Sequence, residues 1–177
     1  MVVISCDFFI PVFSFIRFIK CYNKHRGDKI MKIREVCLND VQDIQFLNEN
    51  QMGYVYPIEK TKQKIEKIIM SSHDKLFVAV KDGHVIGYVH AVDYDVIYMD
   101  HLKNIMGIAV KEDYQKQGIG RQLLSKVEDW AKDDGAMGVR LVSGETRKEA
   151  HLFYQHCGYI SHKKQFHFIK MLKEEEK

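Results

Sequence analysis

The sequence lacks the cysteine spacing of a metal site. Its four cysteines are scattered through 177 residues, and their spacing matches no set of metal ligands: Cys6, Cys21, Cys37 and Cys157. We therefore predict no metal cofactor, and scattered cysteines favour a reduced, cytoplasmic setting. Repeats and low-complexity tracts are also missing, so we expect one soluble domain with a sizeable core.

The sequence has no excess charge once its first thirty residues are set aside. Residues 1–30 carry five basic and two acidic side chains, whereas the remaining residues carry 22 of each sign. A nucleic-acid-binding protein needs a basic face on its folded domain. The balanced charge therefore argues against a nucleic-acid partner.

Long apolar runs are also missing. Residues 2–19 hold five of the ten phenylalanines, but Asp7, Pro11 and Arg17 interrupt the run. A membrane span needs roughly 20 apolar residues, and a signal peptide needs a basic start and a small-residue cleavage site that this segment lacks. We expect no stable membrane association, with a membrane anchor as the alternative.

A mis-assigned translation start explains residues 1–30 better than a membrane anchor does. Arg26-Gly27-Asp28 can be encoded by a purine-rich stretch that would resemble a bacterial ribosome-binding site, and it lies just before Met31. Our hypothesis is that translation starts at Met31. Residues 1–30 are then a leader outside the domain, and residues 31–177 form a single domain.

From Met31 onward, the pattern alternates between strands and helices. The predicted strands are 32–36, 76–80, 85–92, 104–110, 138–143 and two short closing strands within 159–172. The predicted helices begin after a cap at Asn39 or Asp40, near Ile58, after Gly120 and at Arg147. Asp82-Gly83 predicts a hairpin turn, residues 93–102 predict a polar connection, and Thr146 with Glu149 predicts a capping box. This order predicts a mixed α/β sheet of about seven strands.

The most informative motif follows the predicted strand at 104–110. It reads Gln115-Lys116-Gln117-Gly118-Ile119-Gly120, with Arg121 after it. Glycines allow positive φ and a close approach to a ligand, and the N–H groups at a helix start bind anions. We therefore predict a phosphate or pyrophosphate site, with a plain helix-capping turn as the alternative.

Two common nucleotide motifs do not match these residues. A P-loop has Lys and then Ser or Thr after its second glycine, whereas Arg121 and Gln122 follow Gly120. A dinucleotide fingerprint has Gly or Ala three residues after its second glycine, whereas Leu123 stands there. The glycines alone therefore leave open which phosphate is bound.

With this order of elements, the motif resembles the GCN5-related N-acetyltransferase (GNAT) superfamily. A second motif agrees, because Ala-His-Leu-Phe-Tyr-Gln-His-Cys-Gly-Tyr at 150–159 is similar to that family's late helix and following turn. The longer pattern from Ser143 through Arg147 to Tyr154 resembles a small-molecule branch that includes aminoalkylphosphonate and aminoglycoside acetyltransferases.

The resemblance covers residues 31–172 and carries expectations about the fold. It implies a mostly antiparallel sheet flanked by about four helices. It also implies a cofactor cleft, where the strand at 104–110 splays from the strand at 138–143.

The resemblance implies acetyl-CoA as the cosubstrate. The amides of the glycine turn would bind its pyrophosphate, and the backbone at 108–110 would hydrogen-bond its pantetheine arm. The implied cofactor-binding residues are Ile108, Ala109, Val110, Gln115, Lys116, Gln117, Gly118, Ile119, Gly120 and Arg121. Arg147 is a further candidate for a CoA phosphate, since many relatives carry a cofactor-touching asparagine there; a solvated arginine is the alternative.

The resemblance also assigns Tyr154 as the acid that protonates the departing CoA thiolate. A phenol is protonated at neutral pH, and a thiol has a pKa of roughly 8.5, so protonation of the leaving sulfur at neutral pH is favourable; a packed aromatic is the alternative role. Many relatives carry a glutamate base where Asn104 stands, and an amide cannot accept the proton. Asp100 or His101 could act as the base through a water, or the amine arrives partly deprotonated.

Together these residues predict acetyl transfer to the primary amine of a small molecule, by direct attack in a ternary complex. Acidic and aromatic residues before and around the site would suit a cationic amine: Asp93, Asp95, Asp100, Tyr54 and Tyr56. The alternatives are a non-catalytic acyl-CoA-binding or sensor domain, which the missing glutamate favours, and a protein N-acetyltransferase. Homodimers are common in the family, but the sequence shows no interface.

Overall fold

The computed structural model describes residues 30–161 and 163–172. The chain divides into two compact units, one ending at Val142 and the other beginning at Ser143. The predicted leader and the alternative membrane anchor fall on residues 1–29, which lie outside the described residues. Within the described ranges, no helix combines the length and the apolar character needed to cross a bilayer.

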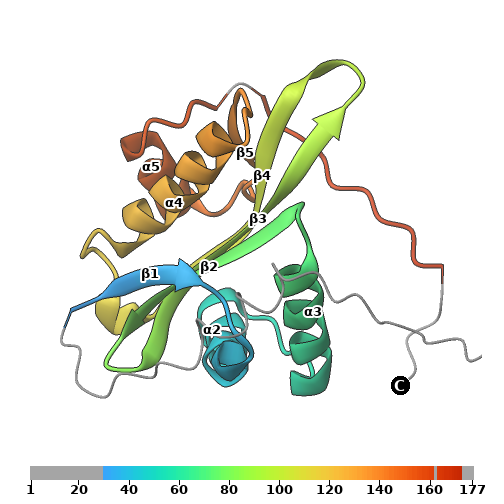
Figure 1. Cartoon of the computed structure of the whole chain (residues 1–177). Coiled ribbons are helices and arrows are strands. Elements are labelled where there is room, and N and C mark those ends of the chain that lie inside the picture. The colour runs from blue at the N-terminus through green and yellow to red at the C-terminus, as the bar shows by residue number, and fades with distance from the viewer. Residues whose placement is uncertain (1–29, 162, 173–177) are drawn as a thin grey trace, which may run out of the picture. The chain divides into compact units, whose positions relative to one another are not determined.

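The first unit is built on one sheet with the strand order β1-β2-β3-β4-β5 (Figure 1). The strands are β1 (Lys32–Glu35), β2 (Asp74–Lys81), β3 (His84–Val96), β4 (Met99–Val110) and β5 (Gly138–Leu141). Neighbours are antiparallel from β1 to β4, whereas β5 runs parallel to β4. The mixed α/β sheet is confirmed, but it has five strands rather than the predicted seven.

Helices cover both faces of this sheet (Figure 1). The helical segments are η1 (Leu38–Asp40), α2 (Val41–Met52), α3 (Ile58–Met70), η2 (Glu112–Tyr114) and α4 (Ile119–Asp133), with α5 (Lys148–His156) in the second unit. Helices α2 and α3 pack Leu47 and Ile65 into a core with Val78 of β2. On the other face, α4 buries Leu123 and Val127 at helical spacing, each fully. The sheet therefore lies between α4 on one face and the pair of α2 and α3 on the other.

The two closing strands predicted within 159–172 are wrong. In the described part of this segment, the chain forms no strand. Phe166, Phe168 and Ile169 are exposed there, at 90%, 89% and 72%. An alternating apolar pattern makes a strand only where a neighbouring strand accepts its backbone hydrogen bonds. This segment has the pattern without such a neighbour among the described residues.

The polar connection predicted at 93–102 is also wrong, because the hairpin of β3 and β4 continues through it. Asp93 pairs with Lys103 and Tyr94 with Leu102, and the pairing of the two strands ends at the turn after Val96. A cross-strand ladder keeps polar residues in a strand when their side chains find partners. Asp93 and Lys103 supply such a pair, since they are hydrogen-bonded to each other.

Two predicted helix caps are missing. Asp40 precedes α2, but its carboxylate accepts the N–H of Cys37 at 2.9 Å and a hydrogen bond from Arg34 at 2.6 Å. Thr146 and Glu149 form no capping box, and α5 begins after Arg147 without a side-chain cap. Helices α2, α3 and α4 form where the pattern predicts them because their apolar faces are covered, whereas α5 forms there without a fully buried residue.

Candidate active site

Strand β4 runs past the end of its parallel partner β5. Backbone pairing extends from Leu102 with Gly138 to Ile105 with Leu141, where β5 ends. β4 continues to Val110 and stays paired to β3 on its other side. In the described part of the chain, one edge of β4 beyond Ile105 therefore has no strand beside it, and we call it the free edge.

The backbone groups of Ile108 and Val110 point to the free edge. The N–H of Lys111 bonds the carbonyl of Ile86 on β3, at 2.8 Å. Residues of an antiparallel strand alternate in the side to which they direct these groups. Ala109 therefore also faces β3, while Ile108 and Val110 face away from it.

The chain passes from β4 to α4 through two left-handed residues. Lys116 has a φ of 59° and Gly118 a φ of 79°, and Gly118 is the N-cap residue of α4, without a side-chain cap. A residue with a Cβ is strained in this region by about 1–2 kcal/mol. No preceding helical turn supplies carbonyls to accept from the first N–H groups of a helix. The exposed turn therefore leads into a helix N-terminus that attracts anions.

Two glutamine side chains hold this turn in place. Nε2 of Gln115 donates to the backbone carbonyl of Val110 at 3.0 Å and to Oε1 of Gln51 on α2 at 3.2 Å. Nε2 of Gln117 donates to the carbonyl of Asp113 at 2.9 Å. Because these side chains bond the protein itself, and the N–H of Gln115 donates to the carbonyl of Glu112 at 3.0 Å, what the turn offers to a ligand is the backbone amides that follow Gln115.

The remaining predicted residues of the turn differ in exposure. Lys116 and Arg121 are exposed, so both place positive charge in solvent beside the turn. Ile119 is only 5% exposed and packs as part of the α4 core face. Gly120 is half-buried. The positive charge of the turn therefore comes from Lys116 and Arg121, together with the N-terminus of α4.

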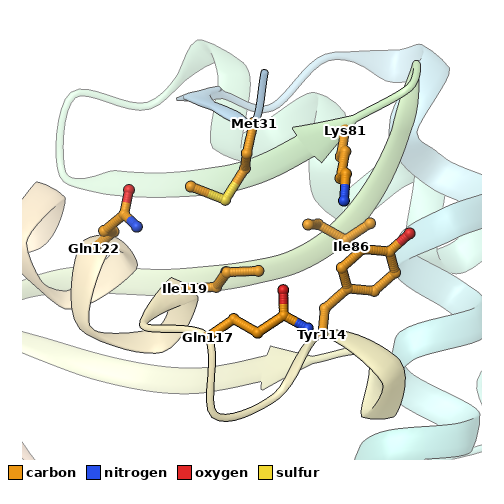
Figure 2. A pocket seen from close by; sticks show the side chains of 7 residues that line it. All are labelled: Met31, Lys81, Ile86, Tyr114, Gln117, Ile119 and Gln122. Carbon is orange, nitrogen blue, oxygen red and sulfur yellow. The ribbon is translucent and has the colours of Figure 1, made fainter. Parts of the chain in front are cut away.

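A pocket of about 220 Å³ lies beside the turn, on the side of β1 to β3 (Figure 2). Its lining residues are Met31, Lys81, Ile86, Tyr114, Gln117, Ile119 and Gln122. Nζ of Lys81 lies 5.1 Å from the centroid of the Tyr114 ring. Ligand pockets usually measure roughly 300–1,000 Å³, and this lining includes no residue of the free edge. We therefore place the candidate site at the free edge rather than in this pocket.

In the second unit, Tyr154 lies half-buried on α5. Its ring centroid is 5.2 Å from that of Phe153 and 6.1 Å from that of Tyr159. Burial raises the pKa of Tyr154 above its ordinary value of 10.0, although the charge of Arg147 opposes the rise. The hydroxyl is therefore protonated at neutral pH. Arg147 is itself exposed, directly before α5.

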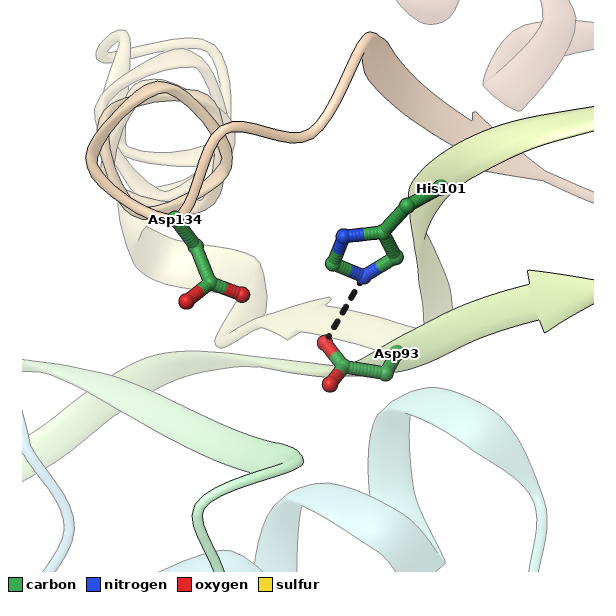
Figure 3. A group of neighbouring side chains, drawn as sticks. All are labelled: Asp93, His101 and Asp134. Atoms are coloured by element: carbon green, nitrogen blue, oxygen red, sulfur yellow. Dashed lines mark ion pairs between the residues drawn. The ribbon is translucent and has the colours of Figure 1, made fainter.

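His101 lies in a charged cluster on the α4 face of the sheet (Figure 3). Its Nε2 is 3.3 Å from Oδ1 of Asp93. The fully buried Lys103 hydrogen-bonds both Asp93 and Asp134, and its Nζ lies 3.8 Å from the centroid of the Trp130 ring on α4. Asp93, His101 and Asp134 offer ligand atoms within 4.8 Å of one another, but the ammonium of Lys103 already bridges the two carboxylates. The cluster thus ties α4 to the sheet.

Asn104 points to the opposite face from Lys103, because neighbours in a strand alternate. Its Oδ1 accepts a hydrogen bond from Nη1 of Arg140 at 3.1 Å, and its Nδ2 donates to Sδ of Met106 at 3.1 Å. The sequence pattern does not single out Arg140, because a parallel register between distant strands leaves no local signal. Asp100, the other predicted base, is exposed near the start of β4.

The residues predicted to line the acceptor side are spread apart. Tyr54 and Asp95 are exposed. Tyr56 is half-buried, and Nζ of Lys64 lies 4.7 Å from the centroid of its ring. Asp93 belongs to the charged cluster on the α4 face. These residues therefore form no single acidic pocket in the described ranges.

Curated N-acetyltransferases are similar to the chain in sequence. The uncharacterized N-acetyltransferase CT2212 of Chlorobaculum tepidum is 29% identical over 134 residues, which cover 76% of this chain and 78% of the relative. The aminoalkylphosphonate N-acetyltransferase of Salmonella typhimurium is 30% identical over 92 residues, which cover 51% of this chain and 57% of the relative.

Solved aminoglycoside acetyltransferases share the fold. AAC(6')-Iy in complex with the bisubstrate analog CoA-S-monomethyl-acetylneamine has a TM-score of 0.72 at 20% identity, covering 80% of this chain and 99% of that one. AAC(6')-Ih from Acinetobacter baumannii has a TM-score of 0.71 at 19% identity, covering 81% and 100%. The model of the acetyltransferase (GNAT) family matches residues 40–159, more than half of the sequence, and the chain therefore belongs to the acetyltransferase (GNAT) family.

Proposed function

We propose that this GNAT acetyltransferase transfers the acetyl group of acetyl-CoA to the primary amine of a small molecule. The observation that carries the proposal is the continuity between the free edge of β4 and the turn before α4. The edge offers the backbone groups of Ile108 and the N–H of Val110, and the turn offers amides at a helix N-terminus. A cosubstrate with an amide-bearing arm next to a pyrophosphate matches this order.

In this proposal, the pantetheine arm lies along the free edge, where a longer β5 would otherwise pair. Its amides exchange hydrogen bonds with the backbone of Ile108. The pyrophosphate accepts hydrogen bonds from the amides of residues 116–120, since the amide of Gln115 already donates to Glu112, while Lys116 and Arg121 attract it from solvent. Arg147 is the further candidate for a CoA phosphate.

The proposed reaction is a direct acyl transfer. The lone pair of the amine attacks the thioester carbonyl carbon, the C–S bond breaks, and the CoA thiolate leaves. The N–H of Ile108 or Val110 donates to the carbonyl oxygen as negative charge develops on it. The amine loses one proton and the thiolate gains one, so the step balances without a further reactant.

Tyr154 is the proposed donor of the proton that the thiolate gains. Its place in the late-helix motif supports this role, and its raised pKa keeps the phenol in the protonated form at neutral pH. The proton lost by the amine passes to water, with Asp100 or His101 as the proposed relay. Asp100 is exposed to solvent, whereas His101 is already engaged beside Asp93.

The proposed acceptor is a small molecule. One relative is named for aminoalkylphosphonates, and several structural neighbours are named for aminoglycosides. Both classes of compound are small and carry amines. These names support a small-molecule amine as the acceptor, in preference to an amine of a protein.

The test incubates the full-length protein with acetyl-CoA and a panel of small amines and peptides, and it follows release of the CoA thiol. Release that requires a small amine supports the proposal. Release only with peptides would replace it with protein N-acetylation. Binding of CoA without turnover on any acceptor would overturn it.

One observation favours the last of these outcomes, a non-catalytic CoA-binding domain. Asn104 stands where the resemblance places a glutamate base, and its Oδ1 already accepts from Arg140. An amide cannot take a proton from the attacking amine. The thiol-release assay therefore decides between an enzyme that uses water-mediated deprotonation and a domain that only binds its cosubstrate.

A further inference from the structure

Arg140 points to a recognition site on the acceptor side of the sheet. We propose that its guanidinium binds an anionic group of the acceptor, so that the preferred substrate is a small amine that also carries a carboxylate, phosphate or phosphonate. This inference rests on the proposed function, because it takes the free edge of β4 as the place where the amine reacts.

The first support is the face of the sheet on which Arg140 lies. Arg140 on β5 is the register partner of Asn104 on β4 and is hydrogen-bonded to it. Lys103 contacts Trp130 of α4, so Asn104 and Arg140 project from the opposite face. Met106 follows Asn104 on that face and is 59% exposed. The face beside Arg140 is therefore accessible to a small molecule.

The second support is that two uncharged groups hold the guanidinium in place. Nη1 donates to Oδ1 of Asn104 at 3.1 Å, and Cζ lies 4.1 Å from the centroid of the Tyr94 ring. Neither contact neutralises the charge. A guanidinium fixed over an aromatic ring keeps its fork of N–H donors pre-organised for a planar or tetrahedral oxyanion.

The third support is that, within the described ranges, no carboxylate forms an ion pair with the guanidinium of Arg140. The ion pairs there use other bases, among them Lys103 with Asp93 and Lys126 with Asp129. A guanidinium has five N–H donors, and one bond from Arg140, to Asn104, occurs among the described residues. Asp100 forms no ion pair with Arg140 within the described residues and lies exposed near the start of β4, where the register with β3 shifts.

Arg140 lies close enough to the free edge to select the acceptor. Asn104, its partner, directly precedes Ile105, beyond which the free edge begins. An anionic group held at Arg140 leaves the amine of a short molecule beside that edge. A polycationic acceptor meets repulsion at the same place. This reverses the preference expected from the acidic residues alone, because Asp93 faces α4 and Asp95 is exposed.

The experiment compares acceptors that differ in one charged group, with the full chain and saturating acetyl-CoA. The anionic arms are β-alanine and 2-aminoethylphosphonate, and the neutral match is β-alaninamide; neamine is the polycationic arm. A charge-assisted hydrogen bond at Arg140 predicts a kcat/KM roughly 10- to 100-fold higher for an anionic acceptor than for its neutral match. The two anionic arms then show whether a carboxylate or a phosphonate is preferred.

Arg140→Met should abolish this preference by raising the KM of the anionic acceptors far more than that of β-alaninamide. Arg140→Lys, which keeps the charge, should restore part of the preference. Lys126→Met is the matched control, because it removes an exposed positive charge on α4 and should leave the preference intact.

Two outcomes overturn the inference while sparing the proposed function. One is equal kcat/KM for β-alanine and β-alaninamide in the wild type. The other is a loss in Arg140→Met that is the same for anionic and neutral acceptors, which would make Arg140 a structural residue. Failure to acetylate any amine, by a chain that binds acetyl-CoA, would instead overturn the proposed function and this inference with it.

Discussion

Nε2 of Gln115 donates a hydrogen bond to the backbone carbonyl of Val110, at 3.0 Å. This bond joins the start of the glycine turn to the last residue of β4. The same nitrogen reaches Gln51 on α2, at 3.2 Å. A turn that is already ordered presents its amides without a further loss of conformational entropy when a ligand binds. Binding at the turn can therefore be tested separately from catalysis.

Gly118→Ala should weaken the binding of acetyl-CoA. Gly118 has a φ of 79°, and nothing lies within 4 Å of an added Cβ, so the substitution acts through backbone strain alone. Strain of about 1–2 kcal/mol shifts the turn from its observed shape, and we expect the Kd of CoA to rise roughly tenfold. Isothermal titration calorimetry measures this change.

Gly135→Ala is the matched control for that variant. Gly135 has a φ of 70°, an equally open surrounding, and a place after the other end of α4. It should lower the free energy of unfolding by a similar amount and leave the Kd of CoA unchanged. An unchanged Kd in Gly118→Ala, with the same loss of stability in both variants, would remove the turn from the binding site.

Tyr154→Phe should lower kcat and leave the affinity for CoA nearly unchanged. The substitution keeps the ring that packs near Phe153 and Tyr159 but removes the proton donor. General acid catalysis contributes at least roughly 100-fold, which sets the expected loss. Steady-state kinetics with a CoA titration separates the two parameters, and Tyr159→Phe serves as the control. Equal losses of kcat and CoA affinity would show that Tyr154 is structural.

The pH dependence of kcat gives an independent test of the same residue. Burial raises the pKa of the Tyr154 phenol above 10.0, so the acid form persists as pH rises through that value. Any alkaline loss of activity caused by Tyr154 should therefore lie above pH 10 and vanish in Tyr154→Phe. A loss of kcat below pH 10.0 that is absent from Tyr154→Phe would contradict a pKa of Tyr154 raised by burial.

How much the sequence predicts depends on the range of the interactions involved. The hairpin turn at Asp82-Gly83 and the left-handed Gly118 follow from local backbone preferences, and both are confirmed by their positive φ. The length of the β3–β4 hairpin depends on pairs such as Asp93 with Lys103, which no local pattern contains. The alignment of Asn104 with Arg140 is of the same kind. The site residues that the sequence pattern leaves out are therefore those set by cross-strand register.

Lys103→Met should destabilise the protein by about 3 kcal/mol, because it leaves Asp93 and Asp134 without the ammonium that bridges them. Chemical unfolding with urea measures the change in free energy. The control is Lys126→Met, whose exposed ion pair with Asp129 spans 3.8 Å and is worth less than about 1 kcal/mol. Equal stability of Lys103→Met and the wild type would mean that apolar packing replaces the cluster without cost.

The same cluster predicts how stability depends on pH. Burial of Asp93 would raise its pKa, but hydrogen bonds from Lys103, His73 and His101 outweigh it, and the pKa of Asp93 lies below its ordinary value of 3.8. Its contribution is therefore fully present above pH 3.8 and is lost as pH falls through the lower folded pKa. Urea unfolding at a series of pH values should show a steeper acid loss for the wild type than for Asp93→Asn. Parallel curves would contradict this assignment.

The central claim is that this chain moves an acetyl group from acetyl-CoA to an amine in one step. The most direct test measures, in the same reaction, the CoA thiol released and the N-acetylated amine formed, with and without the amine. The account predicts one acetylated amine for each CoA released and no release above the spontaneous rate when the amine is absent. CoA release that proceeds without an amine, or binding of acetyl-CoA with no acetylated amine, would contradict it.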